Sequence, residues 1–185
     1  MDILLHTCCG PCATYSTEHL LSEGFTPLMY YNNPNIHPFR EWKRRREALK
    51  TFAQIRKLPL LIEEEYEMQK FLRKINLHEQ ERCQYCYELR LNKTAEKAKE
   101  LGIEWFGTTL FISPYQNREM ILKIGTDLAA HYNLRFYERD FRPGFRRSQE
   151  VADELGLYKQ GYCGCIYSEF ERYAKKRNRP LIIMS

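Results

Sequence analysis

Seven cysteines are the residues of this chain best suited to chemistry, and they fall into three groups. Thiolates bind zinc and iron–sulfur clusters, and a pair of thiols can carry two electrons as a disulfide. An odd count argues against a closed framework of structural disulfides, so the pattern indicates metal binding or redox chemistry. The groups are Cys8, Cys9 and Cys12, then Cys83 and Cys86, and finally Cys163 and Cys165.

The first two groups share a Cys-x-x-Cys spacing that suits a common metal centre. Cys83 and Cys86, at positions i and i+3, are expected on one face of a helix. Cys9 and Cys12 repeat the spacing at a predicted helix N-terminus, where unpaired N–H groups and the helix dipole favour thiolate over thiol. Four thiolates at one site suit an iron–sulfur cluster as well as zinc.

Two simpler explanations compete with a functional centre. A single cysteine is often just a small buried hydrophobic residue. A structural zinc site is the stronger alternative, but zinc ribbons usually bring their cysteine pairs together across about 15–20 residues. Here most of the first half of the chain separates Cys12 from Cys83. A site assembled from such distant segments favours function over structural support.

The third group, Cys163-Gly164-Cys165, has a different spacing. One intervening residue is poor for cluster binding but allows a short-range disulfide, for which Gly164 supplies backbone freedom. A disulfide that closes so small a ring is expected to be strained, and strained bridges are the easily reduced ones. The alternative is two loop thiols with no shared role.

The elements that must position these cysteines alternate between strand and helix. Such alternation indicates an α/β fold with a mostly parallel sheet and helices on both faces, forming a single domain over residues 1–185. Open parallel sheets bind ligands beyond the carboxyl ends of their strands, where the first strand-to-helix loop, here carrying the first cysteine group, lines the crevice. Apolar runs predict strands at 2–7, 25–31, 58–62, 104–112 and 134–138, and a final apolar run lies at 181–184. Helical spacing predicts one helix between the first strand and residue 21, and further helices at 39–56, 79–101, 121–132, 148–155 and 167–176.

Composition narrows the class of protein. The chain has 185 residues, of which 43% are hydrophobic and 29% charged, as in a globular protein. No apolar run approaches the roughly 20 residues of a membrane span, and the N-terminal residues do not resemble a secretory signal. We therefore expect a cytoplasmic protein with no membrane partner. The net charge of +5 suits a nucleic-acid partner without requiring one.

Basic residues gather in three clusters that could contact phosphates. A run of charge is equally typical of a solvated surface, so both interpretations stay open for each cluster. Tyr31, Phe141 or Tyr162 could stack on an unpaired base. The clusters are Arg40, Lys43, Arg44, Arg45 and Arg46; Arg142, Arg146 and Arg147; and Arg172, Lys175, Lys176, Arg177 and Arg179.

Five motifs together carry a resemblance to a known family. Between about residue 3 and residue 170 the chain resembles the epoxyqueuosine reductase QueH family, and the combination is specific although no single motif is. The motifs are His6-Thr7-Cys8-Cys9-Gly10-Pro11-Cys12, Tyr31-Asn32-Asn33-Pro34-Asn35-Ile36-His37-Pro38, Cys83-Gln84-Tyr85-Cys86-Tyr87, Asp140-Phe141-Arg142-Pro143 and Tyr162-Cys163-Gly164-Cys165.

The resemblance implies an oxidoreductase with a three-layer Rossmann-like (HUP-like) domain. Such an enzyme reduces epoxyqueuosine in tRNA to queuosine without cobalamin, using a [4Fe-4S] cluster, an adjacent metal ion expected to be iron, and an unidentified electron donor. By this resemblance Cys12 is left over and could ligate the adjacent ion. His6 or His37 could donate a proton, or either could serve packing alone. The implied cluster ligands are Cys8, Cys9, Cys83 and Cys86, and the implied redox-active pair is Cys163 and Cys165.

Two other classes of protein remain as alternatives. A zinc-stabilised RNA-binding module without catalysis would be colourless and would not need Cys163-Gly164-Cys165. An ATP-dependent tRNA-modifying enzyme on a related nucleotide-binding fold is disfavoured, because the chain has neither G-x-G-x-x-G nor G-x-x-x-x-G-K-[ST].

Overall fold

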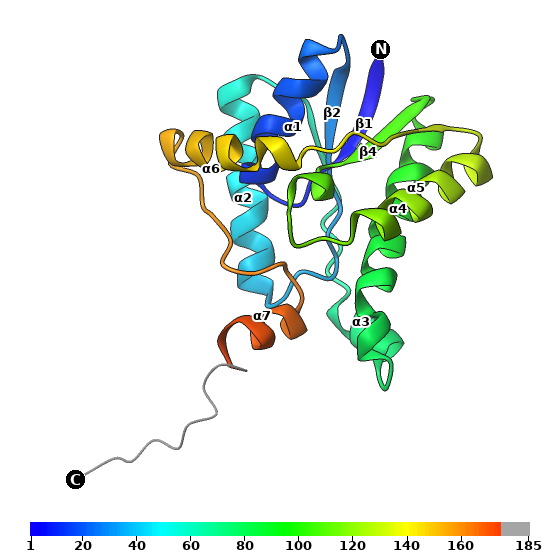
Figure 1. Cartoon of the computed structure of the whole chain (residues 1–185), viewed down its shortest axis with the longest axis vertical. Coiled ribbons are helices and arrows are strands. Elements are labelled where there is room, and N and C mark those ends of the chain that lie inside the picture. The colour runs from blue at the N-terminus through cyan, green and yellow to red at the C-terminus, as the bar shows by residue number, and fades with distance from the viewer. Residues whose placement is uncertain (175–185) are drawn as a thin grey trace.

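A five-stranded, all-parallel sheet forms the centre of the computed structural model, which describes residues 1–174. The strand order is β3-β2-β1-β4-β5. Figure 1 shows α1, α2 and α6 on one side of the sheet and α4 and α5 on the other, so the predicted α/β fold with two helical layers is confirmed. The strands are β1 (Asp2–His6), β2 (Thr26–Tyr31), β3 (Leu60–Ile62), β4 (Trp105–Thr108) and β5 (Arg135–Tyr137).

Seven α-helices and three 3-10 helices accompany these strands within residues 1–174, and η3, α6 and α7 follow the last strand. The predicted final apolar run at 181–184 and the end of the predicted helix 167–176 lie outside the described residues. The α-helices are α1 (Gly10–Ser22), α2 (Phe39–Arg56), α3 (Met68–Ile75), α4 (Arg82–Glu100), α5 (Arg118–Tyr132), α6 (Phe145–Glu154) and α7 (Ile166–Tyr173), and the 3-10 helices are η1 (Glu79–Glu81), η2 (Thr109–Ile112) and η3 (Arg142–Gly144).

The central strand β1 directs the chain toward the first cysteine group. Its residues Ile3, Leu4 and Leu5 are fully buried, because helices cover both faces of the sheet. The strand pairs with β2 on one side and β4 on the other, so its carboxyl end is the point where the strand order reverses. Crevices at such switch points are the usual ligand sites of open parallel sheets.

Two elements differ from the sequence-based expectation. The predicted strand 104–112 ends at Thr108, whose hydroxyl accepts a hydrogen bond from the backbone N–H of Leu110 and so starts η2 instead. Helix α3 was not predicted, and only two of its residues, Phe71 and Ile75, are buried. No helix among residues 1–174 has both the length and the apolar character that a membrane span requires.

Candidate metal and redox site

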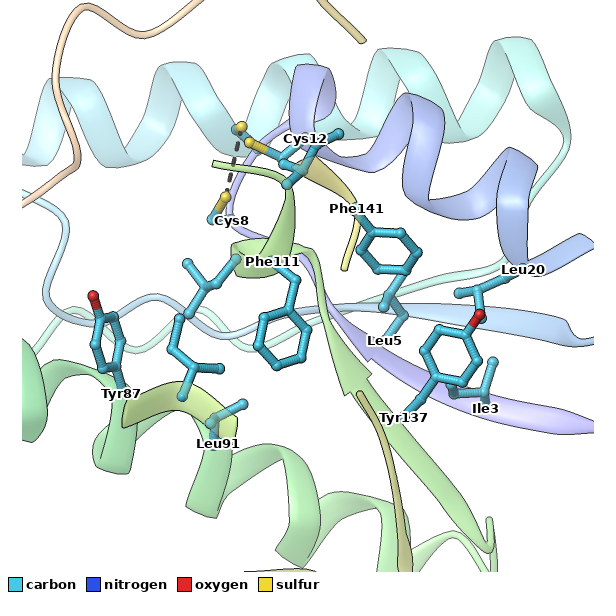
Figure 2. Close-up of a cluster of buried hydrophobic side chains, with 14 of the residues drawn as sticks. Ile3, Leu5, Cys8, Cys12, Leu20, Tyr87, Leu91, Phe111, Tyr137 and Phe141 are labelled. Carbon is cyan, nitrogen blue, oxygen red and sulfur yellow. Dashed lines mark hydrogen bonds between the residues drawn. The ribbon is translucent and has the colours of Figure 1, made fainter. Parts of the chain in front are cut away.

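The first cysteine group gathers at the N-terminus of α1. Cys9 is the N-cap residue, Cys8 precedes it and Cys12 lies in the first turn. The three Sγ atoms lie within 4.8 Å of one another, all three residues are buried, and the Cys8 and Cys9 sulfurs are 3.7 Å apart. Figure 2 shows Cys8 and Cys12 at the edge of the core cluster that contains Phe111 and Phe141. Such a compact group of sulfurs suits a soft metal ion.

Protonation of this group depends on the contacts among its own sulfurs. Hydrogen bonds from Cys12 and Cys9 hold the pKa of Cys8 well below its ordinary value. Burial raises the pKa of Cys9, and the hydrogen bond with Cys8 raises the pKa of Cys12. Of the three sulfurs, Cys8 is therefore the one whose thiolate form the other two favour. A metal ion would displace the remaining protons, because cysteine binds metals as thiolate.

Two polar residues that the sequence did not single out contact these sulfurs. Thr109, at the start of η2, accepts a hydrogen bond from the Cys8 backbone N–H at 3.4 Å and donates one to the Cys8 sulfur at 3.7 Å. Gln160 donates its side-chain amide to the Cys12 sulfur at 3.6 Å. Neither residue belongs to a recognisable motif, so only the fold reveals them.

The second cysteine group lies in the first two turns of α4. Cys86 packs against the core cluster that contains Cys8, Cys9 and Cys12, whereas Cys83 is exposed. Burial raises the pKa of Cys86 to about 11, and nearby Cys163 adds to this rise. Within residues 1–174, neither α4 cysteine joins the close group at α1.

The third group, Cys163-Gly164-Cys165, is fixed through its main chain. Arg45 donates to the carbonyl of Cys163 at 2.7 Å and to that of Tyr162 at 2.9 Å. His37 donates its backbone N–H to the carbonyl of Gly164 at 2.7 Å and accepts from the Tyr162 hydroxyl. Because none of these contacts uses a sulfur atom, they do not depend on the oxidation state of the two cysteines. Figure 1 shows this segment passing beside the start of α2 on its way to α7.

Gly164 has no substitute in this loop. Its φ of 155° is one that L-residues rarely adopt, and an added Cβ would lie 3.4 Å from the Arg45 guanidinium. Arg45 itself is only 1% exposed and forms an ion pair with Glu41 at 2.7 Å. The basic run on α2 therefore includes one cation that faces inward, and the expectation that Arg45 contacts phosphate is wrong.

The two candidate proton donors are both neutral histidines. His6 uses both ring nitrogens, with Thr108 at 2.9 Å and Asn33 at 3.2 Å, and burial lowers its pKa to about 4. His37 accepts the backbone N–H of Ile166 at its Nδ1, and burial lowers its pKa to about 4 as well. His6 thus links the carboxyl ends of β1 and β4 to the loop after β2, and His37 positions the start of α7.

The basic clusters differ in how many of their charges are compensated. Arg142, Arg146 and Arg147 each form an ion pair with a nearby carboxylate. Arg40, Lys43 and Arg44 have no ion pair among the described residues and line a cavity of about 490 Å³ beside Tyr158. Of the predicted third cluster, Lys175, Lys176, Arg177 and Arg179 lie outside the described residues.

The suggested stacking residues also separate into two kinds. Tyr31 and Phe141 are fully buried in the core, so neither is available to a base. Tyr162 is half-buried beside the third cysteine group, with the Arg45 guanidinium 5.5 Å from its ring centroid. Tyr115, which the sequence did not single out, is 82% exposed on the loop after η2.

Known structures support the fold. A protein of Methanocaldococcus jannaschii described as a predicted subunit of tRNA methyltransferase superposes with a TM-score of 0.58 at 17% identity, covering 83% of this chain and 75% of that chain. At this identity the likeness concerns the fold alone.

Sequence comparisons concern the family. The profile of the family described as "Epoxyqueuosine reductase QueH" matches residues 3–171. The protein named epoxyqueuosine reductase QueH from Dehalococcoides mccartyi is 37% identical over 94% of this chain and 95% of its own. The proteins of that name from Streptococcus pyogenes and Thermotoga maritima are 37% and 33% identical, over 90% and 94% of this chain and 70% and 93% of theirs. The chain therefore belongs to the epoxyqueuosine reductase QueH family and is an oxidoreductase.

Proposed function

We propose that this chain reduces epoxyqueuosine in tRNA to queuosine, without cobalamin, in the cytoplasm where tRNA is modified. The observation that carries the proposal is the buried group of Cys8, Cys9 and Cys12 at the sheet's switch point, in a chain that matches the family over residues 3–171. The reaction removes one oxygen atom and needs two electrons and two protons. A zinc-stabilised binding module would not need the separate Cys163-Gly164-Cys165 loop.

The residues present fit a thiolate-bound iron centre. Cys8, Cys9, Cys83 and Cys86 would hold a [4Fe-4S] cluster, and Cys12 would ligate an adjacent iron ion. The close packing of Cys8, Cys9 and Cys12 and the placement of Cys86 against the same cluster of side chains support a shared centre. Cys83 is exposed, and its assignment as a ligand rests on the family resemblance. When bound, the centre would supply single electrons and a Lewis-acidic iron.

Cys163 and Cys165 would supply the pair of electrons. In the proposed balance, one epoxide and one dithiol give one alkene, one water and one disulfide. Both carbon–oxygen bonds break, the carbon–carbon double bond forms, and the two thiol protons leave with the oxygen. An external donor must then reduce the disulfide. The main-chain contacts of Arg45 and His37 support this role, because they hold the loop while its sulfurs change state.

Conversion of the substrate tests the proposal directly. Protein prepared without oxygen is incubated with reductant and tRNA that carries epoxyqueuosine, and the digested nucleosides are separated and identified by mass. Queuosine should form in proportion to enzyme added. Absence of conversion by protein with a full complement of iron and sulfide would refute the function, and stoichiometric zinc with tRNA binding but no conversion would favour the binding module.

The uncompensated cluster on α2 is the expected tRNA contact. Reversing Lys43 and Arg44 to Glu should weaken tRNA binding by about tenfold and reduce the salt dependence, because phosphate contacts release counterions. Reversing Arg146 and Arg147, which already pair with carboxylates, is the matched control and should change the Kd by less than about twofold. Titrations at several salt concentrations measure both quantities. Equal weakening in the two variants, or wild-type binding that ignores salt, would contradict this surface.

A further inference from the structure

Arg90 is a buried cation whose terminal nitrogens donate to no acceptor among residues 1–174. The residue is 2% exposed on α4, and its Nε donates to the Asn35 side-chain oxygen at 2.9 Å. Among residues 1–174, no other hydrogen bond or ion pair involves its guanidinium. The side-chain amide nitrogen of Asn35 is buried without an acceptor, and its contact with Cys86 lowers the pKa of that thiol against the larger rise from burial. Donors at so enclosed a place are usually satisfied, so the terminal nitrogens of Arg90 suit a ligand that brings an acceptor atom.

The position of Arg90 on α4 directs its guanidinium toward the cysteine groups. Arg90 follows Cys86 by four residues and Cys83 by seven, so all three share one helix face. Helical side chains lean toward the N-terminus of their helix, which is the end that carries the two cysteines. Burial lowers the pKa of Arg90, but Cys86, Cys163 and Cys8 lie near enough to raise it overall. One terminal nitrogen lies 3.7 Å from where a Cβ on Gly164 would be.

The other buried arginine has no comparable capacity. Arg45 donates to Glu41, to the Cys163 carbonyl and to the Tyr162 carbonyl, so its donors hold the fold together. Within residues 1–174, Arg90 makes one hydrogen bond, through Nε, and its Nη2 lies beside Gly164 of the dithiol loop. Of these two cations, only Arg90 has terminal nitrogens that make no hydrogen bond among residues 1–174.

We propose that Arg90 is a catalytic residue that binds the oxygen atom leaving the substrate. The inference rests on the proposed function and deepens it. As the carbon–oxygen bonds break, negative charge develops on oxygen, and a fixed guanidinium stabilises it by charge-assisted hydrogen bonds. Arginine stays protonated, so both protons of the departing water come from the dithiol. The location beside Cys163 suits this role, because the electrons and the leaving oxygen must meet at the same carbon atoms.

Binding to substrate and product separates this role from a structural one. Arg90→Met keeps the volume and removes the donors, and Arg90→Lys keeps the charge in case the first variant folds poorly. Binding is measured without reductant, so no turnover occurs. Arg90→Met should weaken binding of tRNA with epoxyqueuosine by about 10- to 100-fold, the range for a charged hydrogen bond. The affinity of Arg90→Met for tRNA with queuosine, which lacks that oxygen, should stay within twofold of wild type. The affinity of Arg90→Lys for tRNA with epoxyqueuosine should fall between those of wild type and Arg90→Met. The control Lys93→Met removes an exposed charge from the same helix and should leave both affinities unchanged.

Single-turnover rates and the centre's spectrum complete the test. Arg90→Met should slow conversion by about 100-fold with an unchanged iron content and spectrum, as for loss of an oxyanion donor. Equal loss of affinity for both tRNAs would overturn the inference, since Arg90 would then serve folding or phosphate binding. An altered spectrum with normal single-turnover conversion would overturn it too, because the guanidinium would then serve the metal centre. Wild-type protein that converts no epoxyqueuosine would instead refute the proposed function.

Discussion

Replacement of Cys8 by serine is expected to abolish the metal centre. The Cys8 sulfur lies 3.7 Å from the Cys9 sulfur and accepts a hydrogen bond from the Thr109 hydroxyl, so its position in the close group is fixed. Serine keeps the size but is a far poorer ligand for iron than thiolate. Wild-type protein prepared without oxygen should be brown, whereas Cys8→Ser should be colourless and lack acid-labile sulfide. Absorption spectra with iron and sulfide analysis measure both. Ser16→Ala, in the next turn of α1, is the control and should keep the centre.

Cys12 distinguishes two ligand sets for this centre. If Cys12 holds only the adjacent ion, Cys12→Ser should keep the cluster spectrum and lose about one iron per chain. Its sulfur lies within 4.8 Å of those of Cys8 and Cys9, so it is also near enough to bind the cluster itself. Loss of the spectrum in Cys12→Ser, with retention in Cys83→Ser, would contradict the assignment of Cys83 as a ligand. Stoichiometric zinc without sulfide in wild-type protein would contradict the iron centre altogether.

The fold was largely predictable because its signals are local. The apolar run at β1 and the alternation of strands with helices suffice for a parallel sheet, and the prediction of helices on both faces is confirmed. Helix α3 was missed because its signal is short. Only Phe71 and Ile75 are buried in it, and its N-cap residue Glu67 makes no side-chain capping bond. The helical period itself is present, because the apolar residues Met68, Phe71, Leu72 and Ile75 stand at i, i+3, i+4 and i+7, but it extends over only two turns.

The site was predictable as a set of cysteines but not as an arrangement. Spacing identified the three groups, yet it gave no information about which of them meet across the fold. Arg45 illustrates the same limit, since the run Lys43-Arg44-Arg45-Arg46 resembles a solvated surface. A helical period did offer a signal, because Arg45 follows Trp42 by three residues and precedes Leu49 by four, and both are buried. Arg90 lies beside no cysteine in sequence, so only its helix face relates it to the site.

Replacement of Cys163 or Cys165 by alanine is expected to remove multiple turnover while leaving the metal centre and tRNA affinity near wild type. The loop is held by Arg45 and His37 through its main chain, so a changed side chain should leave the loop in place. The reaction needs two electrons, which a dithiol supplies together and an iron–sulfur centre supplies singly. Gln116→Leu, which removes the 3.1 Å donor to the Cys163 sulfur but no thiol, is the matched control and should retain most turnover.

Trapping the sulfurs during turnover gives a second measurement of the same prediction. Rapid alkylation followed by mass analysis should find Cys163 and Cys165 as a disulfide after one turnover without reductant, and as two alkylated thiols before it. Loss of the centre in either alanine variant would make that cysteine a ligand, and loss of tRNA binding would make it part of the substrate site. Full activity in both variants would overturn the dithiol role, because the electrons would then have to arrive one at a time through the metal centre from an external donor.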